Sequence, residues 1–208
     1  MKAVMSGLDL SHWNVVNDFV KVRNTYNFVI LKAGGSDDGF YKDRCFEKYY
    51  YQAKLANLAV GAYYFVGRNF HGTQTGIKEA QRFLQLLAGK EFDMPVYVDI
   101  ETTSPSKKLE VTQAAYAFCE YMEKHGAFVG IYSSDLAGFR DRLNMNTLTR
   151  FAFWVARYGN RPKYVKTYGM WQFSSTGTCA GIRGNVDMDV SYVDYPAIIT
   201  KKGLNKFK

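Results

Sequence analysis

Asp99 and Glu101 stand at the end of an apolar run that begins at Val96. The β-branched and aromatic residues of this run favour an extended strand, and the breaker-rich segment 102–105 ends it. Residues two apart on a strand point to the same side, so the two carboxylates share one face, with Cα atoms about 6–7 Å apart. An isolated pair of this kind commonly caps a turn or forms an ion pair. It indicates acid/base chemistry when further acids converge on it.

Two more acids occupy equivalent places, Asp9 after the first predicted strand and Asp187 near the last. A carboxylate cluster without His or Cys has two main uses: it binds Mg²⁺ or Ca²⁺, or it cleaves glycosidic bonds by acid/base catalysis. The segment Asp187-Met-Asp189 keeps the metal alternative open. Aromatic residues near the strand ends favour a carbohydrate cleft, because flat apolar rings stack on sugars. These residues are Trp13, Tyr63, Phe65, Tyr132, Trp154 and Trp171.

Apolar segments and amphipathic segments alternate along most of the chain. The apolar segments predict eight strands, over residues 4–8, 28–33, 60–66, 96–101, 128–133, 151–156, 168–174 and 184–190. The amphipathic segments predict helices over 15–22, 45–58, 75–87 and 111–124, with a brief helix at 136–143. Helices follow only the earlier strands, so the last third of the chain is predicted to be mostly β.

This order predicts an α/β fold, a modified TIM-like barrel with about five βα units followed by three β-strands. A full eightfold barrel takes about 250 residues, so a chain of 208 residues should lack some helices. A doubly wound open sheet is the competing architecture, but it predicts a glycine-rich phosphate loop, and no such motif occurs. In a barrel, the C-terminal ends of the strands form the active site, so the acids should meet in one pocket.

The composition is consistent with one domain, and it indicates which partners and which environment that domain can have. We expect a single catalytic barrel over residues 1–200 and a solvated, flexible basic tail over 201–208. The formal charge of +8 attracts polyanions, and its dispersion along the chain argues against nucleic acid. The chain has no apolar run of about 18 residues, so its sequence predicts no membrane span. The three cysteines, Cys45, Cys119 and Cys179, are far apart and predict reduced, mostly buried thiols.

Several short motifs together resemble glycoside hydrolase family 25, the muramidases also called Chalaropsis-type lysozymes. They occur in the family's order and cover essentially the whole chain. The motifs are Gly7-Leu-Asp-Leu-Ser-His-Trp13, Ile30-Leu-Lys-Ala-Gly-Gly35, Gly61-Ala-Tyr-Tyr-Phe65, Pro95-Val-Tyr-Val-Asp-Ile-Glu101, Gly130-Ile-Tyr-Ser133, Phe153-Trp-Val-Ala156, Trp171-Gln-Phe-Ser174 and Gly184-Asn-Val-Asp187. The resemblance implies a barrel with five βα units and three further strands. It also implies hydrolysis of the β-1,4 bond between N-acetylmuramic acid and N-acetylglucosamine in peptidoglycan, with retention of configuration.

The resemblance also implies roles for residues of this chain. Glu101 matches the general acid/base, Asp99 the second carboxylate, and Asp9 and Asp187 the two flanking acids. Asp99 either attacks the anomeric carbon or orients the substrate's own N-acetyl group as the nucleophile, and we favour the second because the substrate carries a 2-acetamido group. Substrate contacts are expected from Lys32 and Gln172 and from the six aromatic residues named above. We expect no metal or cofactor.

The resemblance also predicts partners and a place of action. The partners are peptidoglycan glycan strands and anionic wall polymers, which the basic surface would attract, and the protein is expected to be a monomer. The N-terminus lacks the pattern of a secretory signal. We therefore expect a phage endolysin-like enzyme that is made in the host cytoplasm and reaches the cell wall through a holin pore. The alternative is a non-catalytic wall-binding module on a barrel scaffold, which would keep the aromatic residues and lose the acids.

Overall fold

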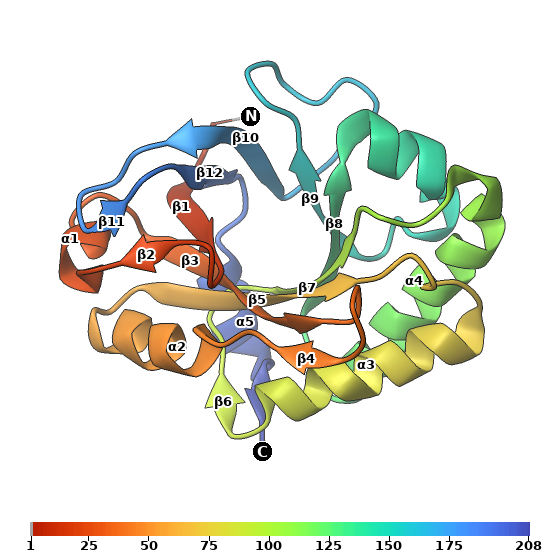
Figure 1. The fold of residues 1–208 in the computed structure, drawn as a ribbon, viewed down its shortest axis with the longest axis horizontal. Helices are drawn as coiled ribbons and strands as arrows, with labels where there is room; N and C mark the ends of the chain where they lie inside the picture. Colours follow the sequence, from red (N-terminus) through yellow and green to blue (C-terminus); the bar gives the residue numbers. More distant parts are fainter. Residues whose placement is uncertain (1) are drawn as a thin grey trace.

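The computed structural model describes residues 2–208 and forms a closed barrel of eight strands (Figure 1). The barrel strands are β1 (Met5–Leu10), β3 (Phe28–Gly35), β5 (Ala59–Val66), β7 (Val96–Ile100), β8 (Val129–Ser134), β9 (Ala152–Ala156), β10 (Met170–Gly177) and β12 (Val186–Ser191). The sheet closes because β1 pairs with both β3 and β12. Only β12 runs antiparallel to its barrel neighbours.

Helices follow the early strands and cover the outside of the barrel. They are α1 (Phe19–Arg23), α2 (Phe46–Leu55), α3 (Thr73–Leu87) and α4 (Lys108–Lys124), with α5 (Tyr195–Lys202) near the C-terminus. A π-helix, η2 (Asp135–Arg140), follows β8, and short 3-10 helices lie at η1 (Pro105–Lys107) and η3 (Met145–Thr147). Among residues 2–208, no helix lies between β9 and β10 or between β10 and β12 along the chain, and Phe139 of η2 packs against Phe153 of β9. The predicted barrel with five helical units and three further strands is confirmed.

Strand alternation divides the core into two parts. Along β3, Phe28 and Ile30 point into the barrel, whereas Val29 and Leu31 point outward toward the helices. The outer part contains stacked rings from β5, α3 and α4, including the pair Phe83 and Phe118. Side chains of α5 pack with the inner part, so this helix closes the N-terminal end of the barrel. The C-terminal end of the barrel strands is therefore the end that can hold a functional site.

The first connection differs from the predicted helix over residues 15–22. Val15–Val16 forms a short strand, β2, that pairs with β11 (Ile182–Arg183), and the helix begins only after Asp18. Asp18 has an extended backbone and accepts hydrogen bonds from the N–H groups of Val20 and Lys21. A side-chain cap of this kind fixes where a helix starts. The predicted brief helix at 136–143 is present, and its first part is the π-helix η2.

The predicted flexible tail is wrong, because the last residues pack on the barrel. β13 (Lys206–Phe207) pairs with β6 (Lys90–Glu91), and the ring of Phe207 is buried. Asn205 is fully buried, donates to the carbonyl of Met94 at 2.9 Å and accepts from the N–H of Phe128 at 2.7 Å. These bonds satisfy main-chain groups at the N-terminal ends of two barrel strands. The last strand is part of the domain.

Two further features are the state of the cysteines and the character of the helices. Cys119 and Cys179 are buried, Cys45 is half-buried, and all three are unpaired. Across residues 2–208, no helix combines the length and the apolar character that a membrane crossing requires.

Candidate active site

A cleft of about 170 Å³ opens at the C-terminal ends of the barrel strands and collects nearly all of the predicted site residues. They are Asp9, Trp13, Lys32, Tyr63, Phe65, Asp99, Glu101, Tyr132, Trp154, Gln172 and Asp187. Strand alternation explains the convergence, because Tyr97 and Asp99 on β7 point into the barrel while Val98 and Ile100 pack against the helices. Closure of the barrel places Asp9 of β1 directly opposite Asp187 of β12.

Asp99 and Glu101 differ in their access to water. Asp99 is 3% exposed, and its Oδ1 has no hydrogen-bond partner among the described residues. Burial raises the pKa of Asp99 well above its ordinary value, and the charge of Glu101 adds to this, while Lys32 opposes it. Glu101 is exposed at the mouth, where a substrate can reach it. Removal of water by the cleft walls still raises the pKa of Glu101, and Asp187 adds to this rise.

Lys32 lies on β3 and contributes a cation to the cleft. Its Nζ stands 4.5 Å from the centre of the Phe65 ring, so the ring face partly solvates the ammonium group. The same charge lowers the pKa values of Asp99 and Glu101, against the effect of burial. Lys32 therefore limits the rise in the pKa values of these two carboxyl groups.

A hydrogen-bond chain holds Asp9 in the barrel. The Nε2 group of Gln172 donates to Oδ2 of Asp9 at 2.7 Å, and the hydroxyl of Tyr132 donates to Oε1 of Gln172 at 2.9 Å. Burial raises the pKa of Asp9 well above its ordinary value, the charge of Asp187 raises it further, and the amide of Gln172 opposes the rise. Only 2% of Gln172 is exposed, so its amide is directed at Asp9 and not at solvent.

Asp189 is a buried acid at the base of this cluster. It points to the same side of β12 as Asp187, and its Oδ1 accepts from Nε1 of Trp154 at 2.8 Å. Its Oδ2 has no partner among the described residues, and burial together with the charge of Asp9 raises its pKa well above the ordinary value. No set of three or more His, Cys, Asp or Glu side chains within residues 2–208 is arranged to hold a metal ion. Asp189 is therefore a neighbour of the acid cluster and a partner of Trp154.

The structure corrects the expected role of Trp171. This residue does not line the cleft, and its Nε1 donates to the carbonyl of Arg157 at 2.8 Å. It points away because successive residues of β10 alternate between the two faces and Gln172 takes the inward position. Trp154 reaches the floor of the cleft, but its ring is 1% exposed and packs against Tyr132. Trp13, which is 79% exposed, is a ring that a substrate can reach at the mouth.

Tyr158 and Ser11 also line the cleft, although the sequence did not point to them. Tyr158 follows the end of β9 by two residues, so the signal that selected the other aromatic residues, a ring just after a strand, would have found it. Ser11 follows β1 in the same way.

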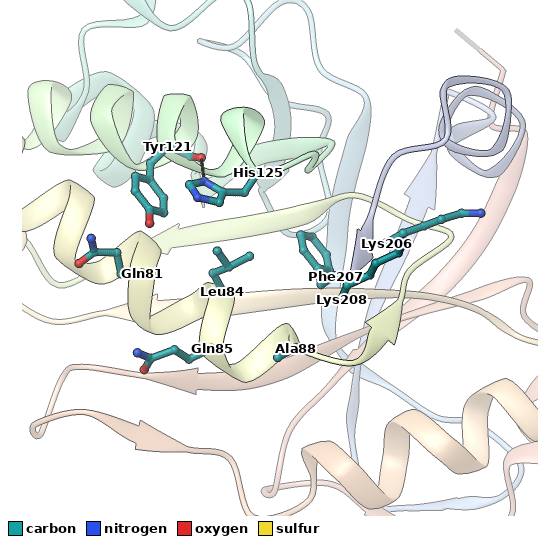
Figure 2. Close-up of a pocket in the computed structure, with 9 residues that line it drawn as sticks. All are labelled: Gln81, Leu84, Gln85, Ala88, Tyr121, His125, Lys206, Phe207 and Lys208. Carbon is teal, nitrogen blue, oxygen red and sulfur yellow. Dashed lines mark hydrogen bonds between the residues drawn. The ribbon is translucent and has the colours of Figure 1, made fainter.

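A larger surface groove of about 440 Å³ lies elsewhere, between α3, α4 and the C-terminal strand (Figure 2). The rings of Tyr121 and His125 stack along its α4 side, and Phe207 and two lysines close one end. No carboxylate side chain lines this groove. Volume alone would favour it, but the acids and Lys32 favour the smaller cleft as the candidate active site.

Carboxyl groups gathered with aromatic rings at the C-terminal ends of barrel strands are the arrangement of a glycoside hydrolase. The family described as glycosyl hydrolases family 25 matches residues 8–182. The chain therefore belongs to this family.

Relatives and solved structures agree with this assignment. The chain is 27% identical over 187 residues to an autolytic lysozyme of Clostridium acetobutylicum, and 27% identical over 202 residues to lysozyme M1 of Streptomyces globisporus. The matches cover 89% and 88% of this chain but only 55% and 66% of those two proteins. The CTP1L endolysin structure superposes with a TM-score of 0.81 at 26% identity, over 96% of this chain and 70% of that one. A bacterial lysozyme from Streptomyces coelicolor shares the fold, with a TM-score of 0.78 at 23% identity, over 97% of this chain and all of that one.

Proposed function

We propose that the protein is a peptidoglycan hydrolase that acts on the bacterial cell wall. In this proposal it is an N-acetylmuramidase, which cleaves the β-1,4 bond between N-acetylmuramic acid and N-acetylglucosamine with retention. The observation that carries the proposal is the pairing of an exposed acid, Glu101, with a buried acid, Asp99, in a cleft with exposed rings. The similarity to lysozymes and to an endolysin supports the choice of substrate.

Glu101 acts as the general acid and then as the general base. A general acid must hold its proton near the working pH and must reach the glycosidic oxygen. Removal of water by the cleft walls and the charge of Asp187 raise the pKa of Glu101, and its exposure at the mouth gives access. After the leaving group departs, the same carboxylate takes a proton from the attacking water.

Asp99 acts on the substrate's 2-acetamido group. A carboxylate nucleophile must approach the anomeric carbon closely, and Asp99 is nearly closed off by the cleft wall. In the substrate-assisted route, Asp99 accepts a hydrogen bond from the amide N–H of the sugar, which directs the amide oxygen to the anomeric carbon. The burial of Asp99 therefore supports substrate assistance over direct attack.

The first test compares the wild-type protein with Glu101→Gln on purified cell walls. We expect the wild type to release muropeptides whose new reducing end is N-acetylmuramic acid, read by mass analysis. Glu101→Gln should release none while its thermal unfolding stays unchanged. Glu120→Gln removes a half-exposed carboxylate of α4 that pairs with Lys124 away from the cleft, and it is the matched control, which should keep full activity. If the wild type binds walls without cutting them, the protein is a binding module instead.

The second test separates the two routes for Asp99. Inhibition by a thiazoline, the sulfur analogue of the bicyclic oxazoline that forms when the acetamido oxygen attacks the anomeric carbon, is expected for substrate assistance. A sugar trapped covalently on Asp99 would instead establish direct attack. Asp99→Asn loses activity on either route, so this variant alone does not discriminate between them.

A further inference from the structure

The connection from β9 to β10 is fastened to η2 by one buried carboxylate. Asp135, which is 1% exposed, accepts from Nη1 of Arg157 at 2.7 Å. It also accepts from the backbone N–H groups of Lys163, Tyr164 and Val165, at 2.7, 3.1 and 2.9 Å. Burial opposes its ionisation, yet these donors hold the pKa of Asp135 below its ordinary value. Both of its oxygens are thus used to hold residues 157–165.

This anchored loop carries Tyr158 into the cleft. Tyr158 is 54% exposed, lines the cleft, and places its hydroxyl 3.2 Å from Oε1 of Gln172. Burial raises its pKa to about 12, and the charges of Asp187, Asp9 and Glu101 contribute, so the phenol stays protonated beside the acid cluster. The loop places a neutral ring with a donor hydroxyl close to the acids.

The contact of Tyr158 with Gln172 is a contact that a ligand can replace. Tyr132 donates to the same Oε1 of Gln172 over a shorter distance, 2.9 Å, and Tyr132 is buried whereas Tyr158 is not. Gln172 therefore stays satisfied when the hydroxyl of Tyr158 turns away, and its bond to Asp9 is undisturbed. A half-exposed ring with a hydroxyl that is free to change partner suits a sugar ring and its hydroxyl groups.

We propose that Tyr158 binds the glycan as a second ring of the cleft besides Trp13, and that Asp135 is a positioning residue that holds Tyr158 there. The ligand is a pyranose ring of the aminosugar chain, so this inference rests on the proposed function. Asp135 touches neither substrate nor reacting atoms and acts only through the loop. The inference adds a specificity determinant on the loop between β9 and β10.

The test measures kcat and KM separately on soluble glycan fragments of peptidoglycan. Tyr158→Ala should raise KM about 3–10-fold, the equivalent of one aromatic contact, with kcat within about twofold of the wild type. Tyr158→Phe keeps the ring and should restore most of the affinity. Tyr164→Ala removes a half-exposed ring of the same loop that does not line the cleft, and it should leave KM unchanged.

The role of Asp135 is tested by a double-mutant cycle. Asp135→Asn places an amide donor against Arg157 and the backbone donors, so it should raise KM as Tyr158→Ala does. In the Tyr158→Ala background, the same change should raise KM little further, because the positioned ring is already gone. A merely structural role would lower the melting temperature and add its full effect in both backgrounds. That additivity, or an unchanged KM in Tyr158→Ala, would overturn the inference.

These outcomes are separable from a failure of the proposed function. Release of muropeptides by the wild type and its loss in Glu101→Gln are established first, and they do not depend on Tyr158. If Asp135→Asn does not fold, Arg157→Gln tests the same anchor by removing one of its donors. Binding of the fragments to Glu101→Gln, with and without Tyr158→Ala, gives the affinity without turnover. Equal affinity of these two proteins would also overturn the inference.

Discussion

Replacement of Asp189 by Asn should stabilise the protein, and more so as the pH rises. Asp189 is completely buried, and only one of its two oxygens has a hydrogen-bond donor, the indole of Trp154. Burial and the neighbouring Asp9 raise its pKa well above the ordinary value. The carboxyl group therefore favours the folded state only when it is protonated. Asn keeps the shape and the acceptor for Trp154, and it can never become charged.

The sign follows from proton linkage. Below the ordinary Asp pKa of about 4, both folded and unfolded chains are protonated at this position, so the group has no cost. Above that pH the unfolded chain releases its proton and the folded chain keeps it, which lowers stability by about 1.4 kcal/mol for each pH unit until the folded group also ionises. Over the three pH units between pH 4 and pH 7 this slope amounts to at most about 4 kcal/mol. We therefore expect Asp189→Asn to gain up to about 4 kcal/mol at pH 7 and almost nothing at pH 4.

The assay is thermal unfolding of both proteins at pH 4 and pH 7. For a chain of this size, the expected gain raises the melting temperature by about 2–4 °C for each kcal/mol. Asp38→Asn, which neutralises an exposed carboxylate, is the control and should show no such dependence on pH. If Asp189→Asn is destabilised by the same amount at both pH values, the reasoning about the buried acid is refuted.

Three further changes address other parts of the molecule. Trp13→Ala should lower kcat/KM about 3–10-fold without changing the melting temperature, because the ring is almost fully exposed, and unchanged kinetics would exclude it as a substrate platform. Lys32→Met removes the cation that lowers the pKa values of Asp99 and Glu101, so both limbs of the pH profile of kcat/KM should move to higher pH, and a fixed profile would contradict the electrostatic role. Asn205→Ala leaves two buried main-chain groups unpaired and should lower the free energy of unfolding by about 2–4 kcal/mol in urea titrations, whereas an unchanged midpoint would show that β13 does not brace the barrel.

Local pattern was sufficient for the strands and for most of the acid site. Alternation along 96–101 placed Asp99 and Glu101 on one face before any fold was known, because the strand period is a property of the backbone. Barrel closure followed from the order of strands and helices, and it brought Asp9 and Asp187 to that face. The same pattern placed the start of the first helix too early, at residue 15, because the capping residue Asp18 fixes where that helix begins.

The sequence alone determines which acids the chain carries, their order, and the period of the strands that carry them. This is so because covalent spacing along an extended chain sets which side chains share a face. Tertiary structure decided which rings reach the cleft and which acids are cut off from water. Trp171 turned outward because Gln172 took the inward position on β10, and Tyr158 entered because Asp135 fastened its loop from another strand end. Burial of Asp99 and Asp189, and with it the rise in their pKa values, exists only once the barrel has closed around them.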